Sequence, residues 1–283
     1  SSPGLGTAHQ ASLLPDALRL GPRRVLVAVY AGNDLVDNQV AVYRDGVCGT
    51  QRRDDPDLLA RLADADAAER ERPAFSLEEW RPGPVRLFLS RHSRVYGLLR
   101  AFRRGAMPLP AVSWEEALAQ ARGNPWFHPV DHPRIRTLFT PEARLRALDL
   151  DDPRRQEGER ILRDLLRWMR REAEGAGASL GVVFLPTKEY VFHAEAEEAA
   201  AARGVPLPDA YGALVRMEER FWSGFAAFLR EEGIPYAEVA EALRARAEAG
   251  DPVYSHDWDG HPSAAGHRAI AEAVRAAFPP VVR

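Results

Sequence analysis

The chain has 283 residues, of which 46% are hydrophobic and 28% are charged, and its formal net charge is −3. This balance gives no indication that nucleic acid or an anionic membrane is a partner. The single cysteine, Cys48, excludes an intramolecular disulfide and a zinc site built from several thiolates. Lysine is almost absent, with Lys188 the clear case, and we interpret the excess of arginine, alanine and proline as a bacterial genomic bias.

The first predicted elements are a short helix with Thr7 as its candidate N-cap and a strand over 25–30, VLVAVY. This continuous apolar run is typical of a strand that is buried on both faces of a parallel sheet. From 39 to 150 the pattern is irregular, with charge clusters, the stretch GNPWFHPVDHPR and a helical segment over 86–102. We interpret 39–150 as an insertion that caps a site.

Regular periodicity returns near the end of that region, as helices that alternate with short apolar strands. The predicted elements are, in order, a helix from Asp152 to Gly175 or Gly177, a strand over 180–186, a helix ending at Gly233, a strand over 234–239, and helices over 241–249 and 263–278. Alternation of this kind predicts an α/β fold with a mainly parallel sheet, whose core is formed by 1–38 and 151–283.

Polar residues that could carry chemistry follow the predicted strands, where sites gather in parallel α/β folds. Acyl transfer needs donors for a developing oxyanion, a base and an acid that orients the base. The candidates are the amide of Asn33, the backbone N–H of Gly4 or Gly6, the base His261, and Asp259 or Asp257 as its acid. Candidate pocket residues are Lys188, Tyr190 and Trp258.

Structural interpretations of the same residues stay open. Asn33 could only cap a loop, and His261 could be a structural histidine at a helix start. The stretch HDWDGH could hold a metal ion, although we predict no metal and no cofactor. We interpret Ser90 and Ser93 as the surface of a helix and not as nucleophiles, and Lys188 and Tyr190 could also lie at the surface.

Three blocks of the sequence resemble the SGNH, or GDSL-type, hydrolase superfamily. These blocks are SSPGLGT near the start, GND after the first strand, and DGHPSAAGH before the last helix, in the family's order. The resemblance implies a three-layer α/β/α sandwich with a flavodoxin-like sheet. It also implies that Gly4 and Asn33 are oxyanion donors, that His261 is the base and that Asp259 orients it, with Asp257 as the alternative acid.

The sequence departs from the family pattern in two respects. Many members carry the acid three residues before the histidine, where this chain has Trp258, so the spacing Asp-x-His resembles a branch that includes polysaccharide O-acetyl enzymes. The Gly-Asp-Ser block of the nucleophile is also missing. The family's sheet is ordered two-one-three-four-five, so we expect the serine and two strands from about 60 residues before Ser1.

The expected function is hydrolysis of a small-molecule or carbohydrate ester through a Ser-His-Asp triad. Transfer or removal of a polysaccharide acetyl group is the alternative within enzymes, and a non-catalytic binding or scaffold protein is the alternative outside them. No apolar run approaches the roughly 18 residues of a membrane span. The compartment and the oligomeric state stay open, since a removed signal or anchor would place the protein outside the cytoplasm.

Overall fold

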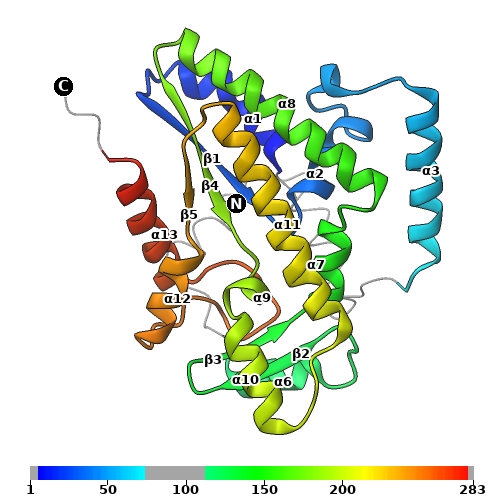
Figure 1. Ribbon diagram of the computed structural model, residues 1–283, viewed down its shortest axis with the longest axis vertical. Helices are drawn as coiled ribbons and strands as arrows, with labels where there is room; N and C mark the ends of the chain where they lie inside the picture. The colour runs from blue at the N-terminus through cyan, green and yellow to red at the C-terminus, as the bar shows by residue number, and fades with distance from the viewer. Residues whose placement is uncertain (1–5, 74–111, 280–283) are drawn as a thin grey trace, which may run out of the picture.

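The structure is a computed structural model that describes residues 6–73 and 112–279. The predicted helix over 86–102 lies outside the described residues, together with Gly4, Ser90 and Ser93. Within the described ranges the protein is α/β, with a small parallel sheet flanked by helices (Figure 1). No helix in these ranges is both long and apolar enough to cross a bilayer.

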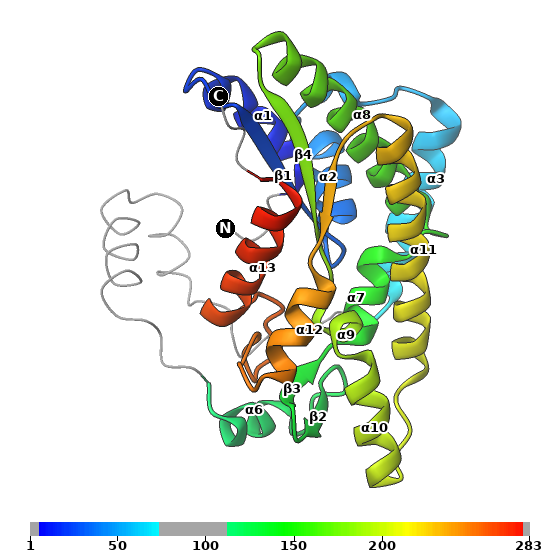
Figure 2. The same ribbon diagram turned by 60° about the vertical axis from the view of Figure 1, so that its left-hand side comes forward.

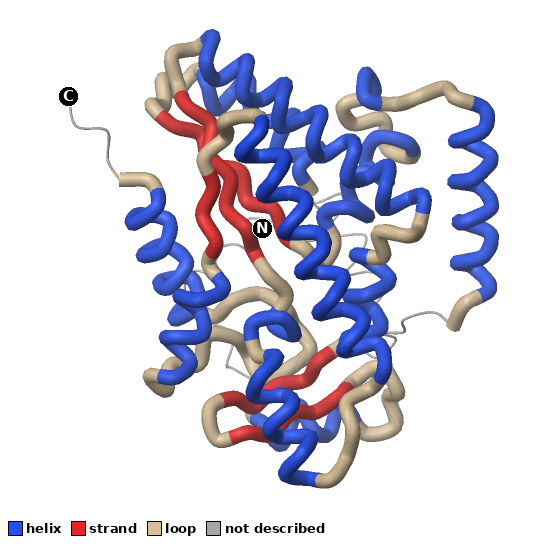
Figure 3. The backbone as a smooth tube through the Cα atoms, in the orientation of Figure 1, coloured by secondary structure: helices blue, strands red, loops and turns tan. Residues whose placement is uncertain are grey.

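In the part of the chain that the structure describes, the parallel sheet has three strands in the order β1-β4-β5. They are β1 (Arg24–Tyr30), β4 (Ser179–Leu185) and β5 (Tyr236–Glu238), which confirms the three predicted strands (Figure 3). All pairings are parallel, so the carboxyl ends of the strands face the same edge. In the described sheet β1 is an edge strand, and its Leu26 is 42% exposed.

Helices lie on both sides of this sheet (Figures 1 and 2). On one side are α1 (Thr7–Leu18), α8 (Pro153–Gly175) and α11 (Asp209–Glu231), and on the other are α12 (Ala240–Glu248) and α13 (Ala264–Ala277). Alternate strand residues point to opposite faces. Accordingly, Val182 and Phe184 of β4 pack with α8 and α11, whereas Val183 between them packs with α12 and α13.

The ends of several helices follow the predicted capping signals. The carboxylate of Asp152 accepts a hydrogen bond from the backbone N–H of Arg154 at the start of α8, and Ser263 caps α13 in the same way. Gly233 follows α11 with a φ of +65°, a left-handed conformation that glycine adopts without strain. These three helix limits confirm the predictions from the sequence.

The predicted N-cap at Thr7 is wrong by one residue. Gly6 occupies the cap position, and Thr7 is the first, fully buried residue of α1. A side chain from another helix supplies the missing acceptor, because Asn38 Oδ1 accepts the Ala8 N–H at 2.8 Å. Asn38 belongs to α2 (Asp34–Tyr43), so a tertiary contact replaces the local cap.

The region from 39 to 150 is more regular than its sequence suggests. Its described parts contain most of α2, a 3-10 turn, three further helices and an antiparallel hairpin. Beyond α2 these are η1 (Gly49–Gln51), α3 (Pro56–Glu71), α6 (Trp114–Ala121), β2 (His128–His132), β3 (Ile135–Phe139) and α7 (Pro141–Leu148). Ala41, Val42 and Leu148 share a hydrophobic cluster with α8 and β4, so these parts pack into the core. The division into core and insertion stays an interpretation.

The hairpin β2–β3 reaches the segment that carries the candidate base. Leu138 N donates to His256 O at 3.0 Å, and Thr137 Oγ1 donates to Ser255 O at 3.0 Å. The sequence did not predict this hairpin, because Pro129 and the histidines interrupt the alternating pattern of β2. The hairpin therefore supports the C-terminal motif directly.

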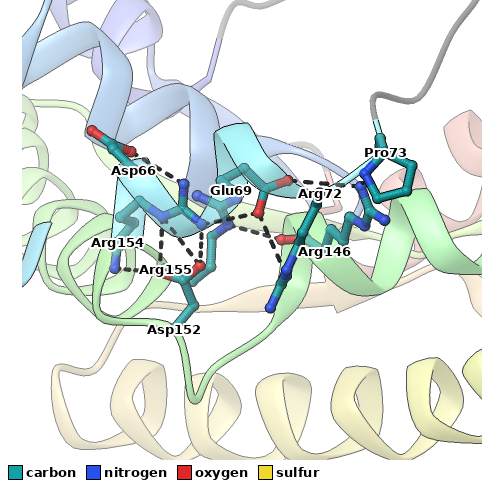
Figure 4. Close-up of polar contacts among 8 residues, drawn as sticks. All are labelled: Asp66, Glu69, Arg72, Pro73, Arg146, Asp152, Arg154 and Arg155. Atoms are coloured by element: carbon teal, nitrogen blue, oxygen red, sulfur yellow. Dashed lines mark hydrogen bonds and ion pairs between the residues drawn. The ribbon is translucent and has the colours of Figure 1, made fainter. Parts of the chain in front are cut away.

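A cluster of ion pairs fastens α3 to the start of α8 (Figure 4). The buried guanidinium of Arg154 contacts Asp152 at 2.6 Å, Asp66 at 3.1 Å and Glu69 at 3.2 Å. Arg146 Nη1 donates to Pro73 O at 2.8 Å in the same cluster. Since α3 buries only Leu58 and Leu62, these polar contacts are a substantial part of its attachment.

Candidate active site

His261 and Asp259 form a hydrogen-bonded pair in the loop before α13. His261 Nδ1 contacts Asp259 Oδ1, and the His261 backbone N–H donates to the same oxygen at 3.0 Å. An ionised carboxylate only accepts hydrogen bonds, so Nδ1 carries the proton and Nε2 is left as a base. The His261 side chain is 63% exposed, which leaves Nε2 accessible to a reacting group.

The pair is coupled electrostatically as well. The hydrogen bond to Asp259 raises the pKa of His261, although partial burial opposes this. Burial also opposes ionisation of Asp259, but the hydrogen bonds from His261 outweigh it and hold the Asp259 pKa below its usual value. Asp259 therefore remains an anion that fixes the imidazole in one tautomer.

Asp257 has a different place in the same loop. Its Oδ1 accepts the Asp259 backbone N–H at 3.0 Å and also contacts Ser255 Oγ. It makes no hydrogen bond to His261 in the described structure. Asp257 therefore braces the turn that presents Asp259, and the geometry favours Asp259 as the partner of His261.

Lys188 lies underneath this loop, where its side chain is fully buried. Its Nζ donates to Asp257 O at 2.6 Å, Thr137 Oγ1 at 3.1 Å and Asp259 O at 3.2 Å. Three acceptors match the three N–H donors of an ammonium group. Burial lowers the Lys188 pKa to about 8, so the charged form still dominates at neutral pH.

The predicted loop that carries Lys188 is in fact a short helix, α9 (Lys188–Val191), capped by Thr187. The surface alternative does not hold for Lys188, which anchors the loop of the candidate base instead. It is also the only lysine in the sequence. A compact ammonium can bind three converging acceptors that the planar guanidinium of arginine does not fit. This geometry explains why an otherwise arginine-rich chain has a lysine at this position.

Tyr190 and Trp258 lie away from the one cavity described near the loop. Tyr190 is half-buried under the Arg244 guanidinium, which lies 5.5 Å from its ring centroid. Trp258 packs against a small cluster around Trp114 and Phe127. The cavity, of about 360 Å³, lies between the hairpin turn and 250–256, and none of the three candidate pocket residues lines it.

Asn33 stands at the carboxyl end of β1, at the N-cap position of α2. Its side chain does not cap the helix. Instead Nδ2 donates to Asp37 Oδ2 at 2.6 Å, which leaves one amide hydrogen for another acceptor. A Cβ built on Gly6 would lie 2.8 Å from Asp37 Cβ, so the start of α1 also reaches Asp37. The structure thus brings Asn33 and Gly6 to the same residue, Asp37, while Gly4 lies outside the described residues.

The end of β1 also reaches the loop of the candidate base. A Cβ built on Gly260 would lie 2.7 Å from the Tyr30 hydroxyl and 2.7 Å from Arg144 Nη2. Gly260 stands between Asp259 and His261, so Tyr30 and Arg144 are immediate neighbours of the pair. The sequence alone indicated neither residue, because Tyr30 belongs to a predicted buried strand and Arg144 lies in the irregular region.

Two buried glutamates complete this polar region. Glu218 Oε1 accepts the Thr187 N–H at 2.9 Å and the Trp222 indole N–H at 3.1 Å, and burial raises the Glu218 pKa to about 7. Glu189 Oε1 accepts the Thr140 N–H at 2.9 Å. One signal was available in the sequence, because Glu218 falls on the apolar face of its helix between Leu214 and Phe221.

The described residues supply no nucleophile at this site. Neither nearby serine is bonded to His261, since Ser255 Oγ contacts Asp257 and Ser263 Oγ contacts Pro252 O. In 6–73 and 112–279, no group of three His, Cys, Asp or Glu side chains is placed to share a metal ion. Comparisons with protein-family models, with curated proteins and with solved structures gave no match.

Proposed function

We propose that the protein is a serine ester hydrolase of the SGNH type, in which His261 is the base and Asp259 orients it. The single observation that carries this proposal is the Asp259–His261 pair, in which the carboxylate contacts Nδ1 while the His261 side chain is 63% exposed. The order β1-β4-β5 agrees with the last three strands of a sheet ordered two-one-three-four-five. Helices on both sides of the sheet support the three-layer α/β/α sandwich.

The proposed reaction has two halves. The serine hydroxyl, expected from chain that precedes Ser1, attacks the ester carbonyl as His261 Nε2 takes its proton. His261 then gives this proton to the departing alcohol, which leaves an acyl-enzyme. Water, deprotonated by the same nitrogen, releases the acid and restores the serine. The free amide hydrogen of Asn33 donates to the oxyanion, together with a backbone N–H of the glycine block.

The pH dependence of the reaction follows from the hydrogen bond between His261 and Asp259. The base must be neutral to accept a proton, and this hydrogen bond raises the His261 pKa. We therefore expect kcat/KM to rise with pH through a value above that of an ordinary histidine. Asp259→Asn should remove the charge that raises the His261 pKa and move this rise to lower pH, in addition to slowing the reaction.

The proposal is tested with the full-length encoded protein and 4-nitrophenyl acetate. His261→Ala should lower kcat by at least about a thousandfold, whereas His267→Ala should leave it unchanged, because His267 is exposed on α13. A fluorophosphonate label should map to a serine before Ser1. A label on Ser93 would contradict the proposed location of the nucleophile. A full-length protein that is folded but inactive would favour the non-catalytic alternative.

A further inference from the structure

Arg144, which lies on α7 beside the candidate base, has hydrogen-bonding capacity that the described residues leave unused. A guanidinium has five N–H donors. Within the described part of the chain, none of the five makes a hydrogen bond, and no carboxylate is in ion-pair range. The Nε atom is buried without a partner, while the residue as a whole keeps partial exposure. A cation that is partly removed from water and has no acceptor destabilises the folded state, and a ligand that supplies an acceptor offsets this loss.

A second unused donor converges on the same position. The Tyr30 hydroxyl is buried and has no partner among the described residues, and the Arg144 guanidinium carbon lies 5.7 Å from the Tyr30 ring centroid. Both groups approach Gly260, each at 2.7 Å from a Cβ built there. Burial raises the Tyr30 pKa to about 12, so the phenol keeps its proton and remains a donor.

Nearby carboxylates act electrostatically on the Arg144 guanidinium, although its N–H groups make no hydrogen bonds in the described residues. Burial opposes the charged form of Arg144, whereas the negative charges of Glu189 and Asp259 favour it and act to raise the Arg144 pKa. No carboxylate of the described residues bonds it, however. Glu189 Oε1 accepts from Thr140 N, Glu189 Oε2 is buried without a partner, and Asp259 Oδ1 accepts from His261 N. The arrangement positions Arg144 next to His261 and leaves its donors available.

From this geometry we infer that Arg144 and Tyr30 bind an anionic oxygen group of the substrate, such as a carboxylate, next to the ester that His261 helps to cleave. A guanidinium fork matches a carboxylate through two parallel N–H···O bonds, and the phenol adds a third donor. Gly260 has no side chain to obstruct the two donors. The inference rests on the proposed function in so far as this anion belongs to the ester.

The test compares two esters that share a leaving group, 4-nitrophenyl acetate and mono-4-nitrophenyl succinate, in the full-length protein. The wild type should prefer the anionic ester in kcat/KM. Arg144→Gln should lower this preference about 10- to 100-fold, mainly through KM, because it removes a charge-assisted pair. Tyr30→Phe should lower it by a smaller factor. Equal losses on both esters would overturn the inference.

Arg146→Gln is the matched control, since Arg146 lies two residues further along α7 and contacts Pro73 and Glu69 in the ion-pair cluster. It should leave the preference for the anionic ester unchanged. If Arg144→Gln does not fold, Arg144→Lys keeps the charge but loses the fork, and it should still lower the preference. A preference equal to wild type in Arg144→Lys and Tyr30→Phe would contradict the inference.

A binding measurement separates this inference from the proposed function. Succinate titrated into the wild type should raise the melting temperature, and Arg144→Gln should abolish that shift. Loss of the shift in Arg144→Gln supports the anion site even if neither ester is hydrolysed, in which case the proposed function fails alone. Hydrolysis of both esters with no succinate effect would leave the proposed function standing and overturn the anion site.

Discussion

Arg154 and Arg144 are two arginines withdrawn from water, and they differ in what surrounds them. Arg154 contacts Asp152, Asp66 and Glu69, and with them it fastens α3 to α8 (Figure 4). Arg144 has no hydrogen-bond or ion-pair partner in the described residues, although Glu189 and Asp259 act on it through their charge. The described residues supply carboxylate partners for Arg154, whereas the N–H groups of Arg144, beside His261, have no hydrogen-bond partner there.

This difference separates a structural charge from a functional one on physical grounds. A buried charge that has all its partners contributes to one conformation, and its removal affects stability. A charge that the fold positions but does not satisfy gains most when a ligand supplies the acceptor, so its removal affects binding. Three variants, taken in order of the effect we expect, test this distinction.

Lys188→Met should have the largest effect, because it removes the cation that binds the carbonyls of Asp257 and Asp259. The turn that holds His261 would lose its anchor, and a shift of about 1 Å at a catalytic group costs on the order of 100-fold in rate. The unfolding free energy should also fall by about 1–3 kcal/mol, because buried acceptors lose their donor. Ester hydrolysis and urea denaturation measure both, and full activity would contradict the anchoring role.

Arg154→Met applies the same substitution to the saturated arginine. We expect the unfolding free energy to fall by about 2 kcal/mol, because the carboxylate of Asp152, mostly buried, loses its ion pair. Activity at a temperature where the variant is folded should stay close to wild type, since the ion pairs of Arg154 join α3 to the start of α8 and do not involve His261 or Asp259. A loss of activity as large as that of Lys188→Met would remove the distinction between the two regions.

Glu218→Gln should have the smallest effect, and its sign depends on pH. The folded pKa of about 7 is above the ordinary 4.5, so the contribution to stability is fully present below 4.5 and is lost as pH rises through 7. Glutamine can keep the hydrogen bonds to Thr187 and Trp222 without ionising. The unfolding free energy of the variant should therefore exceed that of wild type by on the order of 1–2 kcal/mol at about pH 8, with no gain at about pH 4.

Urea denaturation across this range is the measurement for Glu218→Gln. Asp34 is unchanged in both proteins, and its own pKa, raised by burial to about 8, gives both a residual slope. The difference between the two curves isolates Glu218. A difference that stays constant with pH would show that the carboxyl does not titrate in this window.

Much of the fold was predictable because its signals are local. Apolar runs identified β1, β4 and β5, and Asp152, Ser263 and the apolar faces identified α8, α11 and α13. Among the described residues, six helices were not predicted, namely α2, α3, α6, α7, α9 and α10 (His193–Arg203). Most of them lie in charged or proline-containing stretches whose periodicity is weak, and packing against other elements stabilises them.

The candidate site, too, was predictable where its signals are local and not where they depend on distant contacts. A spacing of two residues places Asp259 close to His261, so the sequence predicted this pairing, with Asp257 as the alternative acid, just as it predicted the alternation of helices and strands. The contact of His261 Nδ1 with Asp259 in the structure favours Asp259. Only the tertiary structure decided that Lys188 lies beneath this pair, and that Arg144 is open whereas Arg154 is saturated. Both arginines stand in polar helical stretches, and what distinguishes them is contact with residues far away in the chain, which no local pattern encodes.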